Sequence, residues 1–173
     1  IEAKIFGERN TGTNALAQIM VNNFRVTNLP GTIDAHLPDR ACNLWKRLRP
    51  YIPPGAREQL IDLFFAQKTF RDAWKHAGLS GLTYDGTTKV LFCVRNPLSW
   101  IDSLRKNPYH CKGQPPVELL QFCNWDWKLL RRDNLQYKAL KPLKLYENKL
   151  RSYLEFIEIN EIDHRNYKVI QLE

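Results

Sequence analysis

Residues 3–14 read AKIFGERNTGTN, and this stretch decides the fold that we predict. Residues 3–6 are a strand-like run, and the loop after them leads directly into a helix over 13–24 with apolar residues at helical spacing. Gly7 and Gly12 are five residues apart, as in the phosphate-binding loop G-x-x-x-x-G-K-[ST]. In that loop, glycines let backbone N–H groups surround phosphate oxygens at a helix N-terminus. The pattern therefore predicts an anion site at the start of this helix.

Two positions depart from the nucleotide-hydrolase pattern. Thr13 stands where the lysine of that pattern would be, and Asn14 replaces the Ser or Thr that holds Mg²⁺. An NTPase without these two residues would lack its cation on the β/γ-phosphates and its metal anchor. The loop is therefore predicted to bind an anionic group without Mg²⁺.

A second cluster follows the nearly uninterrupted apolar run of residues 89–94, which is typical of a parallel strand buried on both faces. Asn96 can cap the next helix, and Pro97 suits its first position. Arg95 is therefore expected at the carboxyl end of the strand and Ser103 about two turns into the helix, on the face of Asn96. One phosphate could then contact both Arg95 and Ser103.

Together, the two clusters resemble those of sulfotransferases that use 3′-phosphoadenosine 5′-phosphosulfate (PAPS). In that family the 5′-phosphosulfate loop ends in a small-Gly-Thr-Thr type of sequence, which corresponds to residues 11–14 here. The 3′-phosphate of the donor is held by an Arg-x-Pro-like turn and by a serine eight residues after the arginine. The resemblance implies a PAPS site made of Arg9, Asn10, Thr11, Gly12, Thr13, Asn14, Arg95 and Ser103.

The resemblance also implies the catalytic residues. Many family members carry a Lys-x-His or similar segment on a strand about twenty residues before the 3′-phosphate arginine, and its histidine acts as the base. Here Lys75 and His76 lie at that place, so His76 is the implied base, with Lys75 supporting it or the cationic role. The family's loop lysine is replaced by Asn10, and we expect Arg9 to supply the catalytic cation from one position earlier.

Each of these features has a simpler explanation. A glycine loop is often only a tight turn, Arg95 alone is as readily explained by a salt bridge, and a lone histidine such as His76 is more often structural than catalytic. The joint order and spacing of the three segments favour the sulfotransferase interpretation. Two alternatives stay open: a P-loop kinase or NTPase, and a catalytically inactive sulfotransferase-like module, which Asn10 makes plausible.

The expected architecture is α/β, with a P-loop-type parallel sheet flanked by helices in a single domain over 1–173. A proline-rich, partly helical insertion over 27–71 follows the first βα unit, and the resemblance implies that it shapes the acceptor pocket. Helices are predicted over 117–133 and 143–159, with a last strand over 167–172.

The charge is uneven along the chain. Lys and Arg number 26 against 18 Asp and Glu, a net charge of +8, and the excess is concentrated in residues 128–151. Such a stretch is either a solvated helix face or a surface for an anionic acceptor, and the sequence favours neither. Nucleic-acid binding is not expected, because we find no zinc-finger spacing, RNP-type motif or helix-turn-helix.

The expected activity is metal-independent, in-line transfer of a sulfuryl group from PAPS to a hydroxyl or amine, leaving 3′-phosphoadenosine 5′-phosphate. The acceptor would be a small molecule or a glycan. We expect no membrane segment, because the sequence has no stretch of eighteen apolar residues. A reducing, cytoplasmic location is expected because the cysteines are not spaced as a metal site and nothing demands a disulfide. The sequence starts without Met and stops directly after a predicted strand, which suggests a piece of a longer chain; family members draw further adenine contacts from segments that here would lie beyond Glu173.

Overall fold

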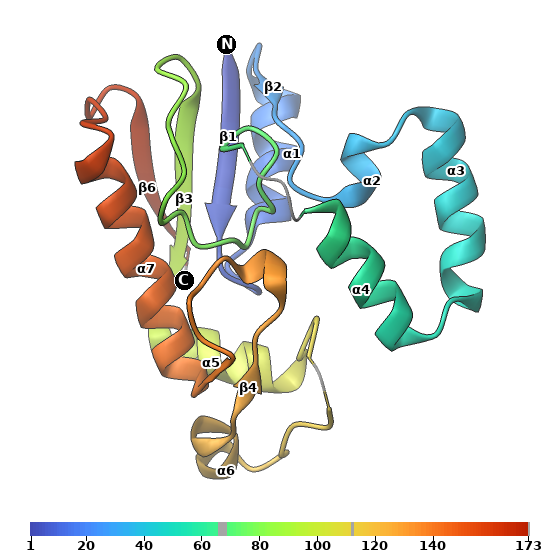
Figure 1. The fold of residues 1–173 in the computed structure, drawn as a ribbon. Coiled ribbons are helices and arrows are strands. Elements are labelled where there is room, and N and C mark those ends of the chain that lie inside the picture. The colour runs from blue at the N-terminus through green and yellow to red at the C-terminus, as the bar shows by residue number, and fades with distance from the viewer. Residues whose placement is uncertain (66–68, 112, 173) are drawn as a thin grey trace.

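A four-stranded, all-parallel sheet forms the centre of the fold (Figure 1). The computed structural model describes residues 1–65, 69–111 and 113–172. The strand order is β2-β1-β3-β6. The strands are β1 (Glu2–Gly7), β2 (Thr27–Asn28), β3 (Lys89–Arg95) and β6 (Tyr167–Leu172). The α/β class and the parallel sheet predicted from the sequence are therefore confirmed.

Two helices cover the opposite faces of this sheet. Successive side chains of a strand point to opposite faces, and in β1 the side chain of Phe6 packs with Tyr153, whereas that of Ile5 packs with Leu16. Tyr153 belongs to α7 and Leu16 to α1, so the sheet lies between these two helices. Their bounds are α1 (Thr13–Asn23) and α7 (Pro142–Ile159).

The carboxyl ends of the central strands lie at one edge of the sheet. Gly7 pairs with Cys93, and Arg95 pairs with Leu172. The loop after β1 and the start of α5 (Pro97–Lys106) therefore leave the sheet at the same edge, where open α/β sheets bind their ligands. The expected cap of α5 is confirmed: Oδ1 of Asn96 accepts hydrogen bonds from the backbone N–H groups of the first helical turn.

The predicted helix over 117–133 is wrong. Only Leu119–Asn124 is helical (α6), and the chain then forms β4 (Trp127–Lys128), the short 3₁₀ helix η2 (Arg131–Asp133) and β5 (Ala139–Leu140), which pairs with β4. Leu120 of α6 is exposed, whereas Trp127 is buried with α5 and α7. Packing of this aromatic side chain into the core thus outweighed the local helical periodicity.

The segment between β2 and β3 carries a helical arm, which we define as residues 33–64. It contains α2 (Ile33–His36), α3 (Asp39–Leu48), the 3₁₀ helix η1 (Arg49–Tyr51) and α4 (Pro54–Phe64). Figure 1 shows the arm projecting sideways from the sheet. The insertion expected over 27–71 is thus largely helical where it is described, and its residues 66–68 lie outside the described residues.

The basic stretch over 128–151 is not one solvated face. Lys149 and Arg132 are fully buried, while Lys128 and Lys138 are exposed. The buried pair carries part of the charge excess into the interior, where carboxylates balance it. No helix within the described ranges has the length and apolar composition needed to cross a membrane.

Candidate functional site

The loop after β1 is a tight turn closed on itself. The N–H and the hydroxyl of Thr11 both donate to the carbonyl oxygen of Glu8, at 3.2 and 2.6 Å. Gly7 is required because a Cβ there would lie 2.7 Å from the carbonyl oxygen of Cys93 on the neighbouring strand. The N–H of Thr11, which the sequence assigned to phosphate binding, is therefore used inside the turn.

The N-terminus of α1 is left open by this turn. Its cap is Gly12, at φ 81°, and it makes no side-chain capping hydrogen bond. The first hydrogen bond of the helix runs from the N–H of Leu16 to the carbonyl of Gly12, so the N–H groups of Thr13 and Asn14 have no acceptor within the helix. Both residues line a pocket of about 600 Å³. Their free N–H groups and the helix dipole attract an anion into this pocket.

Arg9 is a buried structural cation. Its guanidinium donates to Glu8 at 2.6 Å and to Asp133 at 2.9 Å, and it lies over the ring of Trp74, 4.9 Å from the centroid. Burial lowers the pKa of Arg9, but the two carboxylates outweigh this and raise it above its ordinary value. The charge expected to act in catalysis is therefore already balanced by two carboxylates.

Asp133 joins Arg9 to a second buried cation. The ammonium of Lys149 lies 3.0 Å from Oδ1 of Asp133 and also donates to the carbonyl of His76. Burial raises the pKa of Asp133, but Arg9 and then Lys149 lower it well below its ordinary value. The cluster anchors the backbone at His76 to the long helix α7.

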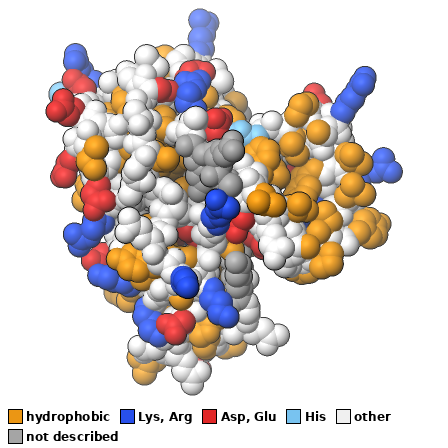
Figure 2. All heavy atoms as spheres, in the orientation of Figure 1, with side chains coloured by type: hydrophobic (Ala, Val, Ile, Leu, Met, Phe, Trp, Pro, Cys, Tyr) orange, Lys and Arg blue, Asp and Glu red, His pale blue; other side chains and the backbone are white. Residues whose placement is uncertain are grey.

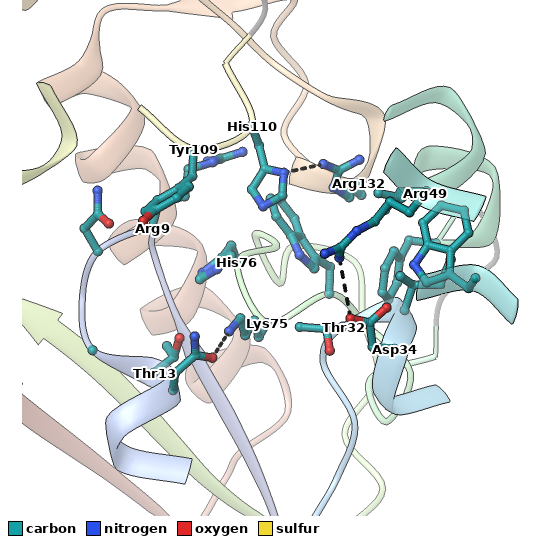
Figure 3. A pocket seen from close by; sticks show the side chains of 18 residues that line it. Arg9, Thr13, Thr32, Asp34, Arg49, Lys75, His76, Tyr109, His110 and Arg132 are labelled. Atoms are coloured by element: carbon teal, nitrogen blue, oxygen red, sulfur yellow. Dashed lines mark hydrogen bonds and ion pairs between the residues drawn. The ribbon is translucent and has the colours of Figure 1, made fainter. Parts of the chain in front are cut away.

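Lys75 places a cation beside the first turn of α1, where the loop itself provides none. Its N–H donates to the carbonyl of Gly31 at 3.0 Å, and its carbonyl accepts from the N–H of Gly7 at 3.0 Å. These bonds hold the segment next to the loop, although it is a turn and not the strand that the resemblance implied. The ammonium of Lys75 donates to Oδ1 of Asn14, in the first turn of α1 (Figure 3).

His76 is held in one orientation on the floor of the pocket. Its Nδ1 lies 2.5 Å from the carbonyl oxygen of Gly7, which can only accept, so Nδ1 carries the proton and Nε2 is the basic nitrogen. Burial, followed by the charges of Lys75 and Arg9, lowers the pKa of His76 well below 6.5. The imidazole is therefore neutral at pH 7 and able to accept a proton.

Arg95 and Ser103 do not line this pocket. The guanidinium of Arg95 donates to the carbonyl of Asn10 at 3.3 Å, and Asn10 adopts the left-handed conformation, with φ 61°. The backbone of Arg95 is fixed by the hydroxyl of Tyr146, at 2.8 and 2.6 Å. Ser103 is half-buried on α5, and among the described residues no hydrogen bond joins its side chain to Arg95. Arg95 therefore adjoins the loop at Asn10, which itself lines the pocket.

Sequence reasoning missed the far wall of the pocket. This wall contains Trp74, which lies between two histidines: His76 and His110 both meet its ring edge-on, at 5.0 and 5.5 Å between centroids. The guanidinium of Arg132 lies 4.6 Å from the centroid of the same ring. No sequence motif marks these residues, which come from separate segments; only their aromatic and basic character hinted at a site. The arm completes the wall with Ile33, Asp34, Trp45, Arg49 and Ile61.

Arg132 connects the arm to the body of the protein. It pairs with Asp62 of α4 at 2.8 Å and with Glu58 of the same helix, and Nδ1 of His110 lies 3.2 Å from it. Burial raises the pKa of Glu58, but hydrogen bonds from His110 and Arg132 lower it to about 2. The arm is thus held against the pocket by charged contacts at α4, and Figure 3 shows Arg132, His110 and Arg49 together along this side.

Comparisons of the chain with protein-family models, curated proteins and solved structures give no match. The chemistry of the site is therefore inferred from its own residues.

Proposed function

We propose that this chain is a PAPS-dependent sulfotransferase. The observation that carries the proposal is the uncapped N-terminus of α1, which opens into a pocket beside the ammonium of Lys75 and the imidazole of His76. A phosphosulfate suits this arrangement because it is anionic, and because the loop offers neither a Walker lysine nor a magnesium-binding hydroxyl, with Thr13 and Asn14 in those places. As part of the same proposal, the α/β fold is of the P-loop type.

Each group of residues has its own role in the proposed reaction. The N–H groups of Thr13 and Asn14 would hold the 5′-phosphosulfate end of PAPS, and Arg95, with Ser103, the 3′-phosphate. When bound, PAPS supplies the sulfuryl group. Lys75 would neutralise the negative charge that develops as the bond between sulfur and the bridging phosphate oxygen breaks, because preorganised cations of this kind stabilise a transition state.

His76 is the proposed general base. With its proton on Nδ1 bound to Gly7, Nε2 can take the proton from the acceptor hydroxyl as the oxygen attacks sulfur. Its lowered pKa keeps it unprotonated at neutral pH, at the expense of some basicity. In this assignment Lys75 replaces Arg9 as the main catalytic cation, and Arg9 supports the pocket floor.

One observation favours a second candidate, an inactive nucleotide-binding module. Arg9, the cation nearest to the family's usual lysine, is tied to Glu8 and Asp133. Such a module would bind the nucleotide and transfer nothing.

Calorimetry tests the proposal. The protein should bind 3′-phosphoadenosine 5′-phosphate more tightly than 5′-AMP or ATP, with the same affinity in EDTA. Binding of ATP that requires Mg²⁺ would overturn the proposal in favour of a kinase or NTPase. Donor binding without sulfation across a panel of phenol, sugar and amine acceptors would identify the inactive module.

A further inference from the structure

The arm carries an apolar surface on the side opposite the pocket. On α3, Cys42 and Trp45 lie on one side of the helix, where Cys42 is buried and Trp45 lines the pocket together with Arg49 of η1. A helical turn of 100° per residue places Leu44 and Leu48 away from this side. On α4, Ile61 likewise faces the pocket while Leu60 and Leu63 face away.

These outward side chains are large and exposed. They form the outer arm surface: Leu44, 55% exposed, Leu48, 50%, Tyr51, 86%, Leu60, 46%, Leu63, 65%, and Phe64, 40%. Figure 2 shows hydrophobic side chains gathered over the arm, more densely than on the rest of the face in view. Clusters of this kind on an otherwise polar protein mark a contact with a partner or a membrane.

The charges around this surface are mostly positive. Arg40 and Arg47 are exposed on α3, on the same side of the helix as Leu44, and Asp39 is the exposed acid next to Arg40 in the sequence. The acids of α4 do not offset this charge, because Glu58 and Asp62 turn inward to Arg132. The outer surface of the arm is therefore apolar with a basic border.

We propose that the outer arm surface binds a membrane surface containing anionic phospholipids. Interfacial helices combine exposed Leu and aromatic side chains with Lys and Arg, whose long stems let their charges reach the headgroups. A lipid surface also suits side chains spread over two helices, since it adapts its shape to them. This inference does not depend on the reaction proposed above.

Vesicle sedimentation tests the proposal. The full chain should sediment with phosphatidylcholine vesicles that contain about one-quarter phosphatidylserine, and far less with phosphatidylcholine alone, with binding that weakens as salt rises. A basic residue at such a surface contributes about a fivefold gain in binding. The combined variant Arg40→Gln and Arg47→Gln should therefore bind roughly 25-fold more weakly.

A second variant tests the apolar part. Leu44→Ser, Leu48→Ser and Leu63→Ser together should abolish most vesicle binding without unfolding the protein, because these side chains are already solvent-exposed. Two controls should bind like the wild type: Lys128→Gln with Lys138→Gln, which remove the same charge elsewhere, and Val117→Ser with Leu120→Ser, which remove exposed apolar side chains elsewhere.

Three results would overturn the proposal. The first is no sedimentation with phosphatidylserine vesicles. The second is an equal loss in the charge-matched control, which would show that net charge alone attracts the protein. The third is self-association in analytical ultracentrifugation that the leucine variant abolishes while vesicle binding is unchanged, which would make the outer arm surface a contact between copies of the chain.

Discussion

The ammonium of Lys75 donates a hydrogen bond to Oδ1 of Asn14 and so places a cation at the first turn of α1. These residues are 61 positions apart in the sequence, and Lys75 lies outside the phosphate-binding pattern, in which Asn14 occupies the last position. Asn14 stands where a magnesium ligand would be, and it holds a lysine instead. The charge that the loop lacks is thus supplied by another segment.

Replacing Lys75 should therefore weaken anion binding at the loop. Loss of a charge-assisted contact costs about 1.5–3 kcal/mol, so Lys75→Met should lower the affinity for 3′-phosphoadenosine 5′-phosphate roughly ten- to a hundredfold. Calorimetry measures this change, and Lys138→Met, at an exposed position, is the matched control. An unchanged affinity in Lys75→Met would indicate that Arg9, and not Lys75, supplies the cation.

Removing the base should abolish most turnover without loss of structure. A positioned general base contributes about 10²- to 10⁴-fold, so His76→Ala should lose activity by that factor and keep donor binding. His164→Ala, at an exposed position, should change neither. Retention of more than about a tenth of the activity by His76→Ala would show that another group takes the proton.

The pH profile gives a separate test of His76. The base works when unprotonated, and its pKa is lowered well below 6.5 by burial and by Lys75 and Arg9. The specificity constant kcat/KM should therefore stay level as the pH falls from 7.5 through 6.5 and decline only at lower pH. A decline centred at or above pH 6.5 would contradict the assignment.

Arg95 should set the preference for a 3′-phosphate. Arg95→Ala should weaken 3′-phosphoadenosine 5′-phosphate about ten- to a hundredfold and leave 5′-AMP nearly unchanged, because only the first nucleotide carries the group that Arg95 would hold. Arg165→Ala, at a position 78% exposed, is the control. Equal losses for both nucleotides would refute the role of Arg95.

Gly12 should be irreplaceable at the start of α1. It has φ 81°, and a Cβ there would lie 2.3 Å from Cδ1 of Leu172, so Gly12→Ala combines a backbone cost of about 1–2 kcal/mol with displacement of Leu172. We expect a lower melting temperature and weaker anion binding. Gly55→Ala is the matched control, because its Cβ would meet no atom within 4 Å. Similar behaviour of both variants would exclude a special requirement at Gly12.

Because of the buried ion cluster, the stability of the protein should fall at low pH. Arg9 and Lys149 hold the pKa of Asp133 below its unfolded value, so its contribution is complete above about pH 4 and is lost as the pH falls through the lower, folded value. Asp133→Asn removes the negative charge that Arg9 and Lys149 share, and should lower the free energy of unfolding by about 3–5 kcal/mol at pH 7. Chemical denaturation measures this, with Asp126→Asn, 71% exposed, as the control. A loss under about 1 kcal/mol would show that the cluster is dispensable.

Local sequence patterns determined the framework that positions the site. The run of apolar residues in β3 and the capping of α5 by Asn96 and Pro97 depend on neighbours in the chain, and both were predicted correctly. In the loop, Gly12 is required by its own backbone conformation, with φ 81°, whereas Gly7 is required by the closeness of Cys93 on the neighbouring strand. Where a pattern competed with packing it failed: the helix predicted over 117–133 gave way to burial of Trp127 in the core.

Only the tertiary structure decided which charges remain available to a ligand. Arg9 and Lys75 are equally basic as letters in a sequence, but Glu8 and Asp133 balance Arg9, whereas Lys75 reaches the helix N-terminus through a neutral amide. Electrostatic energy depends on distances across the folded chain and on burial, and neither can be read from local spacing. The sequence thus predicted where the open helix N-terminus would lie, and the fold decided which cation lies beside it.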